Sequence, residues 1–252
     1  MKPLRTLAWV EMKLFLREPL ALVFAFAFPF FMLFVLLGVF GNEREVTDPE
    51  EAAIWRNVGP ADYYVSTYVG LVMSAAGVIT LPLRLAGYRE AGVLRRYRAA
   101  GVPLGVVLGS QVAVAMGMAM VAAAGIVVVS TALYDSVLPE NWPLVLAGVA
   151  IGLATFACIG IFLGAVLPTA RAVQGAGLAI FFVMMMVSGP GPPDGALTSQ
   201  MRSFAATLPL THVNHLVQDA WLGHGWSLGH ALVALAFAAL TALLALRWFR
   251  WE

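Results

Sequence analysis

The residues best suited to metal chemistry are histidines in the last fifth of the chain. His212 and His215 stand three residues apart, so a helix would place them on one face, and His224 and His230 follow. Two histidines with a carboxylate from the Glu50–Glu51 pair could hold zinc. An intramembrane metalloprotease would carry these groups on facing spans, however, and no His-Glu-x-x-His motif occurs. Metal catalysis is therefore disfavoured, and hydrogen bonding at an interface is the plainer role for the histidines.

Nucleotide chemistry lacks its usual residues. The chain has only two lysines, Lys2 and Lys13, and neither follows a glycine, so no Gly-x-x-x-x-Gly-Lys-Ser/Thr phosphate loop exists. The single cysteine, Cys158, lies in an apolar run, where a thiol is a small buried residue more often than a nucleophile. We expect no cofactor in this chain and no enzymatic activity of its own.

The elements that would position these residues are set by composition. The 252 residues are 61% hydrophobic and only 12% charged, and the net charge is +1. Soluble domains are nearer half apolar and a quarter charged, and disordered chains have low hydrophobicity. A nucleic-acid-binding domain would normally carry a basic excess, so nucleic acid is not an expected partner. The composition predicts an all-α polytopic membrane protein in a lipid bilayer.

Charge-free intervals long enough to cross a bilayer predict six transmembrane helices. We place these spans at residues 19–42, 63–83, 103–133, 142–168, 172–188 and 228–247. Continuous apolar runs, in place of alternating strands of about 10 residues, disfavour a membrane β-barrel.

The charges between the spans predict the orientation. One set of segments, comprising both ends of the chain, 84–102 and Arg171, holds twelve basic and four acidic residues. The opposite set holds three basic and ten acidic residues. The positive-inside rule then places both termini in the cytoplasm.

Three further segments are not spans. Residues 3–18 have an apolar face opposite Lys2, Arg5, Lys13 and Arg17, which is typical of an amphipathic helix at the membrane interface. Glu11 falls inside that apolar face, where it snorkels to the interface, pairs with a nearby arginine or faces a protein partner. Residues 84–102 are the most basic stretch and form either a lipid-binding loop or a short docking helix. Residues 189–227 are too apolar for a free loop and predict two short helices, separated at Pro209, that lie at or re-enter the outer leaflet.

In this order the segments resemble the membrane subunit of ABC exporters of the ABC-2 permease family, over essentially the whole chain. Arg17-Glu18-Pro19 resembles the family's junction into the first span, and Pro29 matches the proline within it. The segment from Arg89-Glu90 to Pro103 resembles the family's coupling segment, with Val93 in place of the usual threonine. Residues 208–211, Leu-Pro-Leu-Thr, resemble the element before the last outer helix.

The resemblance implies a single ABC-2 type transmembrane domain over 1–252 in a bacterial plasma (inner) membrane. It implies two copies of a separate ABC ATPase subunit, which bind ATP and Mg, and a second permease subunit in a homo- or heterodimer. The short length is closest to the daunorubicin-resistance type of multidrug exporter. The expected function is export of a hydrophobic or amphipathic compound such as a drug, an antibiotic or a lipid-like molecule. Direction rests on the resemblance alone.

Two sets of site residues follow from the resemblance. ATPase coupling is assigned to Arg89, Glu90, Leu94, Arg95, Arg98, Glu11 and Arg17. The substrate path, which would run along the first, second and fifth spans, is assigned to Phe24, Phe28, Phe31, Tyr64, Tyr68, Phe181, Met184 and Met185. Aromatic rings and flexible methionines suit bulky apolar cargo, although they also serve as ordinary packing residues. The outer segment contributes Pro209, His212 and His215.

Two alternatives remain open from the sequence. Export of a polysaccharide or lipid-linked glycan would favour a path with more aromatic and polar lining. A non-transport membrane scaffold, or an intramembrane metalloprotease, would not bind an ATPase.

Overall fold

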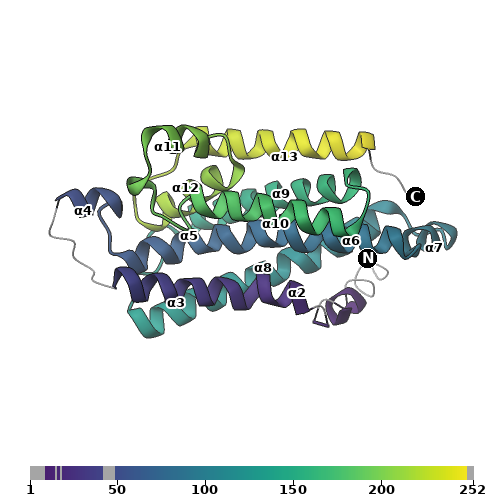
Figure 1. Cartoon of the computed structure of the whole chain (residues 1–252), viewed down its shortest axis with the longest axis horizontal. Helices are drawn as coiled ribbons and strands as arrows, with labels where there is room; N and C mark the ends of the chain where they lie inside the picture. Colours follow the sequence, from purple (N-terminus) through teal and green to yellow (C-terminus); the bar gives the residue numbers. More distant parts are fainter. Residues whose placement is uncertain (1–8, 15, 18, 42–48, 249–252) are drawn as a thin grey trace.

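The structure, a computed structural model, describes residues 9–14, 16–17, 19–41 and 49–248 (Figure 1). These residues form helices and loops, with no β-strand among them. Six of the described helices are long and apolar enough to cross a membrane, which confirms the predicted number of spans. They are Val23–Phe40, Pro60–Glu90, Leu104–Tyr134, Trp142–Val166, Ala170–Val187 and Leu228–Trp248.

The first two spans are each interrupted by a π-helical turn. The first consists of α2 (Pro19–Leu22), η1 (Val23–Ala27) and α3 (Phe28–Phe40), and the second of α5 (Pro60–Ala75), η2 (Ala76–Thr80) and α6 (Leu81–Glu90). The other four spans are α8 (Leu104–Tyr134), α9 (Trp142–Val166), α10 (Ala170–Val187) and α13 (Leu228–Trp248). The shorter elements are α4 (Pro49–Ile54), α7 (Val93–Ala99), η3 (Asp194–Ala196), α11 (Ser199–Ala205) and α12 (Pro209–Trp221).

A proline explains each π-helical turn. Pro29 follows η1 by two residues, and Pro82 follows η2 by two residues. A proline ring clashes with the carbonyl four residues earlier, which lies inside the π-helical turn in both cases, and it has no N–H to donate. The backbone widens, so the N–H of Phe28 bonds to the carbonyl of Val23, five residues back. The two turns contact each other, which brings the bends of the first and second spans together.

The second span is the centre of the bundle. Every residue from Pro60 to Pro82 is buried, whereas most residues of the other spans are partly buried or exposed. Three glycines make this packing possible. A Cβ on Gly160 of α9 would lie 2.3 Å from the Gly77 carbonyl oxygen, and one on Gly177 of α10 would lie 2.2 Å from that of Val78. Small residues allow membrane helices to approach this closely, so η2 packs tightly against both α9 and α10.

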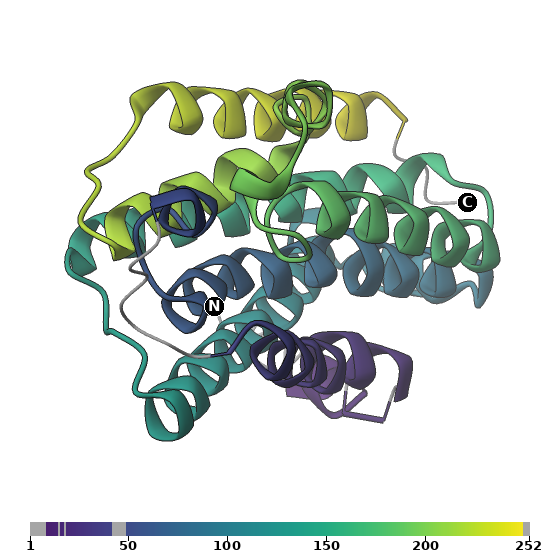
Figure 2. The ribbon, with the colours of Figure 1, turned by 60° about the vertical axis from the view of Figure 1, so that its left-hand side comes forward.

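The connecting elements gather at two opposite ends of the bundle. Residues 9–14, α7 and the last turn of α13 lie at one end, which we call the α7 end, and α4 and α11 lie at the other (Figure 1). The view in Figure 2 places α13 and the first span on opposite sides of the bundle, with α10 between them. The described members of the two sets of segments that differ in charge are therefore separated by the length of the spans.

Two predicted segments can be compared with the helices of the structure. The helix of the second span continues past residue 83, through Arg84 and Arg89, to Glu90. Only the second half of the predicted segment 84–102 forms a separate helix, α7, which begins after a left-handed residue, Gly92 (φ 66°). Of the predicted interface helix over 3–18, residues 3–8, 15 and 18 lie outside the described residues, and residues 9–14 are helical.

Candidate functional site

A buried ion pair joins the N-terminal helix to the second span at the α7 end. The Arg84 Nη2 atom lies 2.6 Å from Glu11 Oε2, and both side chains are almost completely enclosed. The Tyr88 hydroxyl, one helical turn beyond Arg84, donates to the same carboxylate oxygen at 2.6 Å. Glu11 therefore pairs with an arginine of the same chain, as one of the two sequence interpretations held.

The last residues of α6 contact the loop between α9 and α10. Arg89 Nη1 donates to the Gly164 carbonyl oxygen at 3.0 Å, and its Nη2 donates to that of Leu167. The Glu90 carboxylate accepts a hydrogen bond from the backbone N–H of Ala170 at 2.8 Å. The resemblance assigned both side chains to ATPase contact; in the described chain they bond to this loop, with Arg89 partly buried and Glu90 exposed.

The short helix α7 carries the exposed positive charge. Arg95 and Arg98 are exposed, as is Arg17 in the N-terminal segment. Leu94 is buried, so it anchors α7 to this chain in the conformation described. Burial, and then the nearby Glu11, raise the pKa of Tyr97, which keeps its hydroxyl neutral beside the arginines. The sequence-predicted coupling set thus divides into enclosed and exposed side chains.

An aromatic cluster joins the first and fifth spans. The Phe24 and Phe28 rings lie 5.9 Å and 5.8 Å from the ring of Phe181, and Phe28 lies 5.8 Å from Phe182. Most of these ring pairs are edge-to-face, the arrangement that aromatic quadrupoles favour. Phe31, one turn beyond Phe28, is 59% exposed and lies outside the cluster.

The other predicted path residues lie in the interior of the chain. Tyr64 and Tyr68 are fully buried, and Tyr64 donates a hydrogen bond to the Gly191 carbonyl at 2.9 Å. Met184 and Met185 are also buried. A cavity of about 270 Å³ is lined by Met184 and by Pro209, the first residue of α12. A path along the tyrosines would require the spans to move apart.

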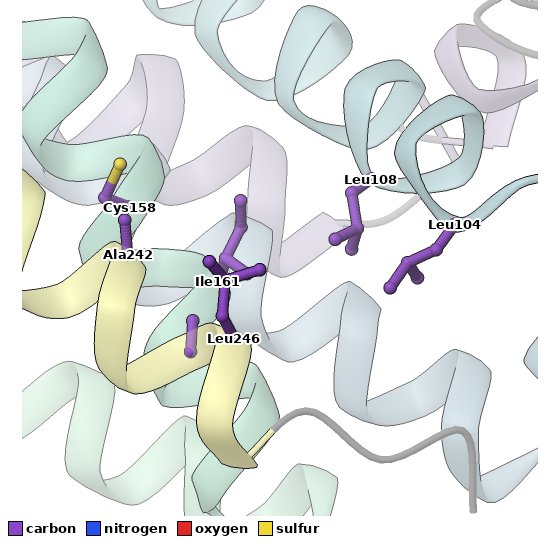
Figure 3. Close-up of a pocket in the computed structure, with 7 residues that line it drawn as sticks. Leu104, Leu108, Cys158, Ile161, Ala242 and Leu246 are labelled. Atoms are coloured by element: carbon purple, nitrogen blue, oxygen red, sulfur yellow. The ribbon is translucent and has the colours of Figure 1, made fainter.

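Two further apolar cavities open between the helices. One, of about 290 Å³, lies between α8, α9 and α13, with Leu104 and Leu108 facing Cys158 and Ile161 (Figure 3). The other, of about 430 Å³, lies at the α4 end and is lined by Phe40, Trp55 and Met186 with the 191–193 turn. Neither cavity contains a residue that the sequence assigned to the path.

The outer histidines form a cluster with a third histidine from α13. His212 Nε2 lies 2.9 Å from the Ala206 carbonyl, which can only accept, so Nε2 carries the proton and Nδ1 faces His230 Nδ1 at 2.9 Å. The rings of His215 and His230 are stacked at 4.7 Å. In the described part of the chain, no three histidine, cysteine or acidic side chains are placed to hold a metal ion.

Charged residues surround His215. Arg56 Nη1 lies 3.3 Å from His215 Nδ1, and Arg56 also donates to Asp219 at 2.5 Å. His215 Nε2 lies 3.5 Å from Asp194. Burial first, and then the charge of Arg56, lower the pKa of His215 to about 4, whereas burial raises the pKa of Asp194. His215 is therefore neutral at physiological pH and accepts at Nδ1 from the guanidinium.

Comparison with known proteins identifies the family that shares this arrangement. The profile of the ABC-2 type transporter family matches residues 3–222. The chain belongs to the ABC-2 type transporter family. The match takes in the N-terminal helix, five of the six spans, α7 and α12. No individually curated protein matches the chain.

Membership makes the chain an ABC permease, a multi-pass membrane protein that works with an ATPase partner. The helix α7, with its exposed arginines, lies in the segment that resembles the coupling segment of the family.

Sequence reasoning missed several members of these sites. It did not select Arg84 and Tyr88, although Arg84 is the first charge after a charge-free run and Glu11 is an acid on an apolar face. It noted His230 without placing its ring against His215, and it missed Arg56, which is 159 residues from His215 in the sequence. A basic residue in an acidic outer segment was the available signal for Arg56.

Proposed function

We propose that this ABC-2 permease is the membrane subunit of an ATP-driven exporter in a bacterial plasma membrane. Two permease subunits, in a homo- or heterodimer, would assemble with two copies of a separate ATPase that binds ATP and Mg. Both termini and α7 would face the cytoplasm, because the α7 end carries the basic residues. This chain would supply no catalytic group to ATP hydrolysis.

The exposed basic helix α7 is the observation that carries the proposal. Arg95 and Arg98 are exposed on α7, while Leu94 holds the helix against the bundle. A short, anchored, positively charged helix outside the apolar spans suits docking to an acidic surface of a soluble subunit. A lipid-binding loop would need the charge but not the anchored helix.

The cargo is proposed to be hydrophobic or amphipathic, as in exporters of the daunorubicin-resistance type. The exposed parts of the first and fifth spans support this class. They include Phe31 and Phe34 of α3 and Phe182 and Met186 of α10. Rings and thioethers bind apolar surface, and they offer few partners for the hydroxyl groups of a glycan.

Charge reversal on α7 tests the ATPase interaction. We expect Arg95→Glu and Arg98→Glu to reduce the ATPase that co-purifies with the permease by about tenfold, since like charges would then face each other. Arg202→Glu is the matched control, because Arg202 is also exposed on a short helix but lies at the opposite end. Equal retention of ATPase by all three variants would refute docking through α7.

Reconstitution tests the cargo. Proteoliposomes that contain the permease and its co-purified ATPase should show ATP hydrolysis stimulated by daunorubicin and ATP-dependent movement of the drug. Stimulation by a lipid-linked glycan alone would assign the glycan alternative. A wild-type permease that retains no ATPase would contradict the exporter proposal itself.

A further inference from the structure

Two consecutive side chains at the end of α6 bind the facing ends of two other spans. Arg89 donates to the carbonyl oxygens of Gly164 and Ala165 at 3.0 Å and 3.3 Å, and to that of Leu167. These groups belong to the last turn of α9 and the residue after it. Glu90 accepts from the N–H of Ala170, the first residue of α10, at 2.8 Å.

Each of the two side chains carries the charge that stabilises the helix end it contacts. The last carbonyls of a helix carry partial negative charge and lack helical partners, and the first N–H groups carry partial positive charge. The Arg89 guanidinium therefore stabilises the end of α9, and the Glu90 carboxylate stabilises the start of α10. Exchanging the two charges would place like charges against both ends.

Tight packing accompanies the hydrogen bonds. Gly164 lies against α6 so closely that a Cβ there would be 3.0 Å from the Leu85 Cβ and 3.3 Å from the Pro82 Cα. With little room between the two helices, the end of α9 follows any displacement of the end of α6.

A short connection that contains Gly92 links α7 to the hydrogen-bonded residues at the end of α6. Glu90 is the last residue of α6, and α7 begins at Val93 after Gly92, whose φ of 66° favours glycine. A force on the exposed arginines of α7 is therefore transmitted to Arg89 and Glu90, which lie within one helical turn of the start of α7.

We propose that Arg89 and Glu90 form an internal latch that transmits displacement of α7 to α9 and α10. They act as positioning residues through the loop 167–169, and they are not the principal contacts of the ATPase. The inference rests on the proposed exporter function, because the displacement would come from the ATPase. In this arrangement a push on α7 moves the second, fourth and fifth spans together.

The latch is tested first in the permease alone, by hydrogen–deuterium exchange of peptides that cover 164–172. We expect Arg89→Ala and Glu90→Ala to speed exchange of these amides roughly tenfold, because each removes a charge-assisted hydrogen bond. Glu90→Gln should have a smaller effect, since its amide oxygen still accepts from Ala170. Arg95→Ala is the matched control, an arginine five residues beyond Glu90 that should leave the exchange unchanged.

Transmission is tested in proteoliposomes with the co-purified ATPase and daunorubicin. The Arg89→Ala and Glu90→Ala permeases should retain the ATPase and hydrolyse ATP, but move roughly tenfold less drug per ATP hydrolysed. Arg95→Ala should instead reduce retention of the ATPase.

The outcomes separate the latch from the exporter proposal. Unchanged exchange at 164–172 in both alanine variants would overturn the latch, whatever the transport result. Faster exchange with normal drug movement per ATP would overturn its role in transmission. Loss of ATPase retention in the Glu90→Ala variant with unchanged exchange would assign Glu90 to the ATPase contact. A wild-type permease without ATPase would refute the exporter function, while the exchange measurement would still report the contacts.

Discussion

The carboxylate of Glu11 and the guanidinium of Arg84 lie 2.6 Å apart in a site closed to solvent, with side chains exposed by 0% and 1%. The pair fastens the N-terminal helix to the most buried span of the bundle. An ion pair in such a place need not stabilise the fold relative to apolar residues, but removal of one partner takes away a charge that compensates the other in a site closed to solvent.

We therefore expect Glu11→Ala to lower the free energy of unfolding by about 3 kcal/mol or more. The double variant Glu11→Ala/Arg84→Ala should lose less free energy of unfolding than the sum of the two single losses, because both charges of the pair are then removed together. Unfolding of the purified permease in mixed detergent micelles measures these differences. Arg17→Ala is the control, since its exposed side chain should change stability by no more than about 0.5 kcal/mol. Strict additivity would show that the two side chains do not interact.

The glycine contacts at the π-helical turn of the second span give a second prediction. A Cβ on Gly77 would lie 2.4 Å from the Phe156 carbonyl oxygen, so Gly77→Ala should destabilise the fold by about 2 kcal/mol. Gly117, in the middle of α8, has nothing within 4 Å of the position of a Cβ. Gly117→Ala should be neutral or stabilising by up to about 1 kcal/mol, because alanine favours the helix. Thermal unfolding of both variants tests the prediction, and equal midpoints would contradict the tight packing at Gly77.

The environment of His215 predicts a dependence on pH. Between its ordinary pKa of 6.5 and about 4, the unfolded chain protonates this histidine and the folded protein does not. The unfolded state then binds more protons, so the histidine makes the free energy of unfolding fall as the pH decreases through this window. Asp194, whose raised pKa acts in the opposite direction, is present in wild type and variant alike.

The His215→Gln variant isolates this contribution. Between pH 7.5 and pH 5, the thermal midpoint of the wild type should fall further than that of the variant. Glutamine keeps an acceptor for Arg56 but does not titrate. Parallel pH profiles would show that His215 has the same pKa in both states. The charged and titratable groups around it are Arg56, Asp194, Asp219, His212 and His230.

Substitution of two phenylalanines, one in the first span and one in the fifth, can distinguish a role in packing from contact with the cargo. Phe181 is fully buried, so Phe181→Ala should cost about 4 kcal/mol of stability by opening a cavity. Phe31 is exposed, so Phe31→Ala should change stability by no more than about 0.5 kcal/mol but raise the KM for daunorubicin. Transport in proteoliposomes beside thermal unfolding distinguishes the two roles. A normal KM in the Phe31 variant would remove this residue from the proposed path.

The buried Tyr68 hydroxyl allows a finer test of the path. Among the residues that the structure describes, it has no hydrogen-bond partner. Tyr68→Phe should therefore leave stability unchanged or raise it by about 1 kcal/mol, because an unsatisfied buried polar group is removed. A loss of transport in a variant of normal stability would indicate that the hydroxyl meets the cargo when the spans separate. Normal transport would indicate that Tyr68 serves packing alone.

The amino-acid sequence alone determined the features that depend on transfer between water and lipid. Apolar runs of sufficient length specified six spans, and the asymmetric basic residues grouped α7 with the N-terminal segment. Pro209 marked the start of α12, since proline suits the first turn of a helix. Pro29 was identified, but the π-helical turn before it was not, because the backbone can meet a proline clash in several ways.

Only the tertiary structure decided which charges meet. Arg84 and Glu11 are 73 residues apart, and Glu90 and Ala170 are 80 apart, so no local pattern connects them. The sequence placed Arg89, Glu90 and Arg95 in one coupling segment. The fold divides them, because Arg89 and Glu90 belong to α6 and bond to the ends of α9 and α10, whereas Arg95 lies on the separate helix α7. The reason is packing: glycines on α9 and α10 let both helices close on the second span, which brings their ends within reach of α6.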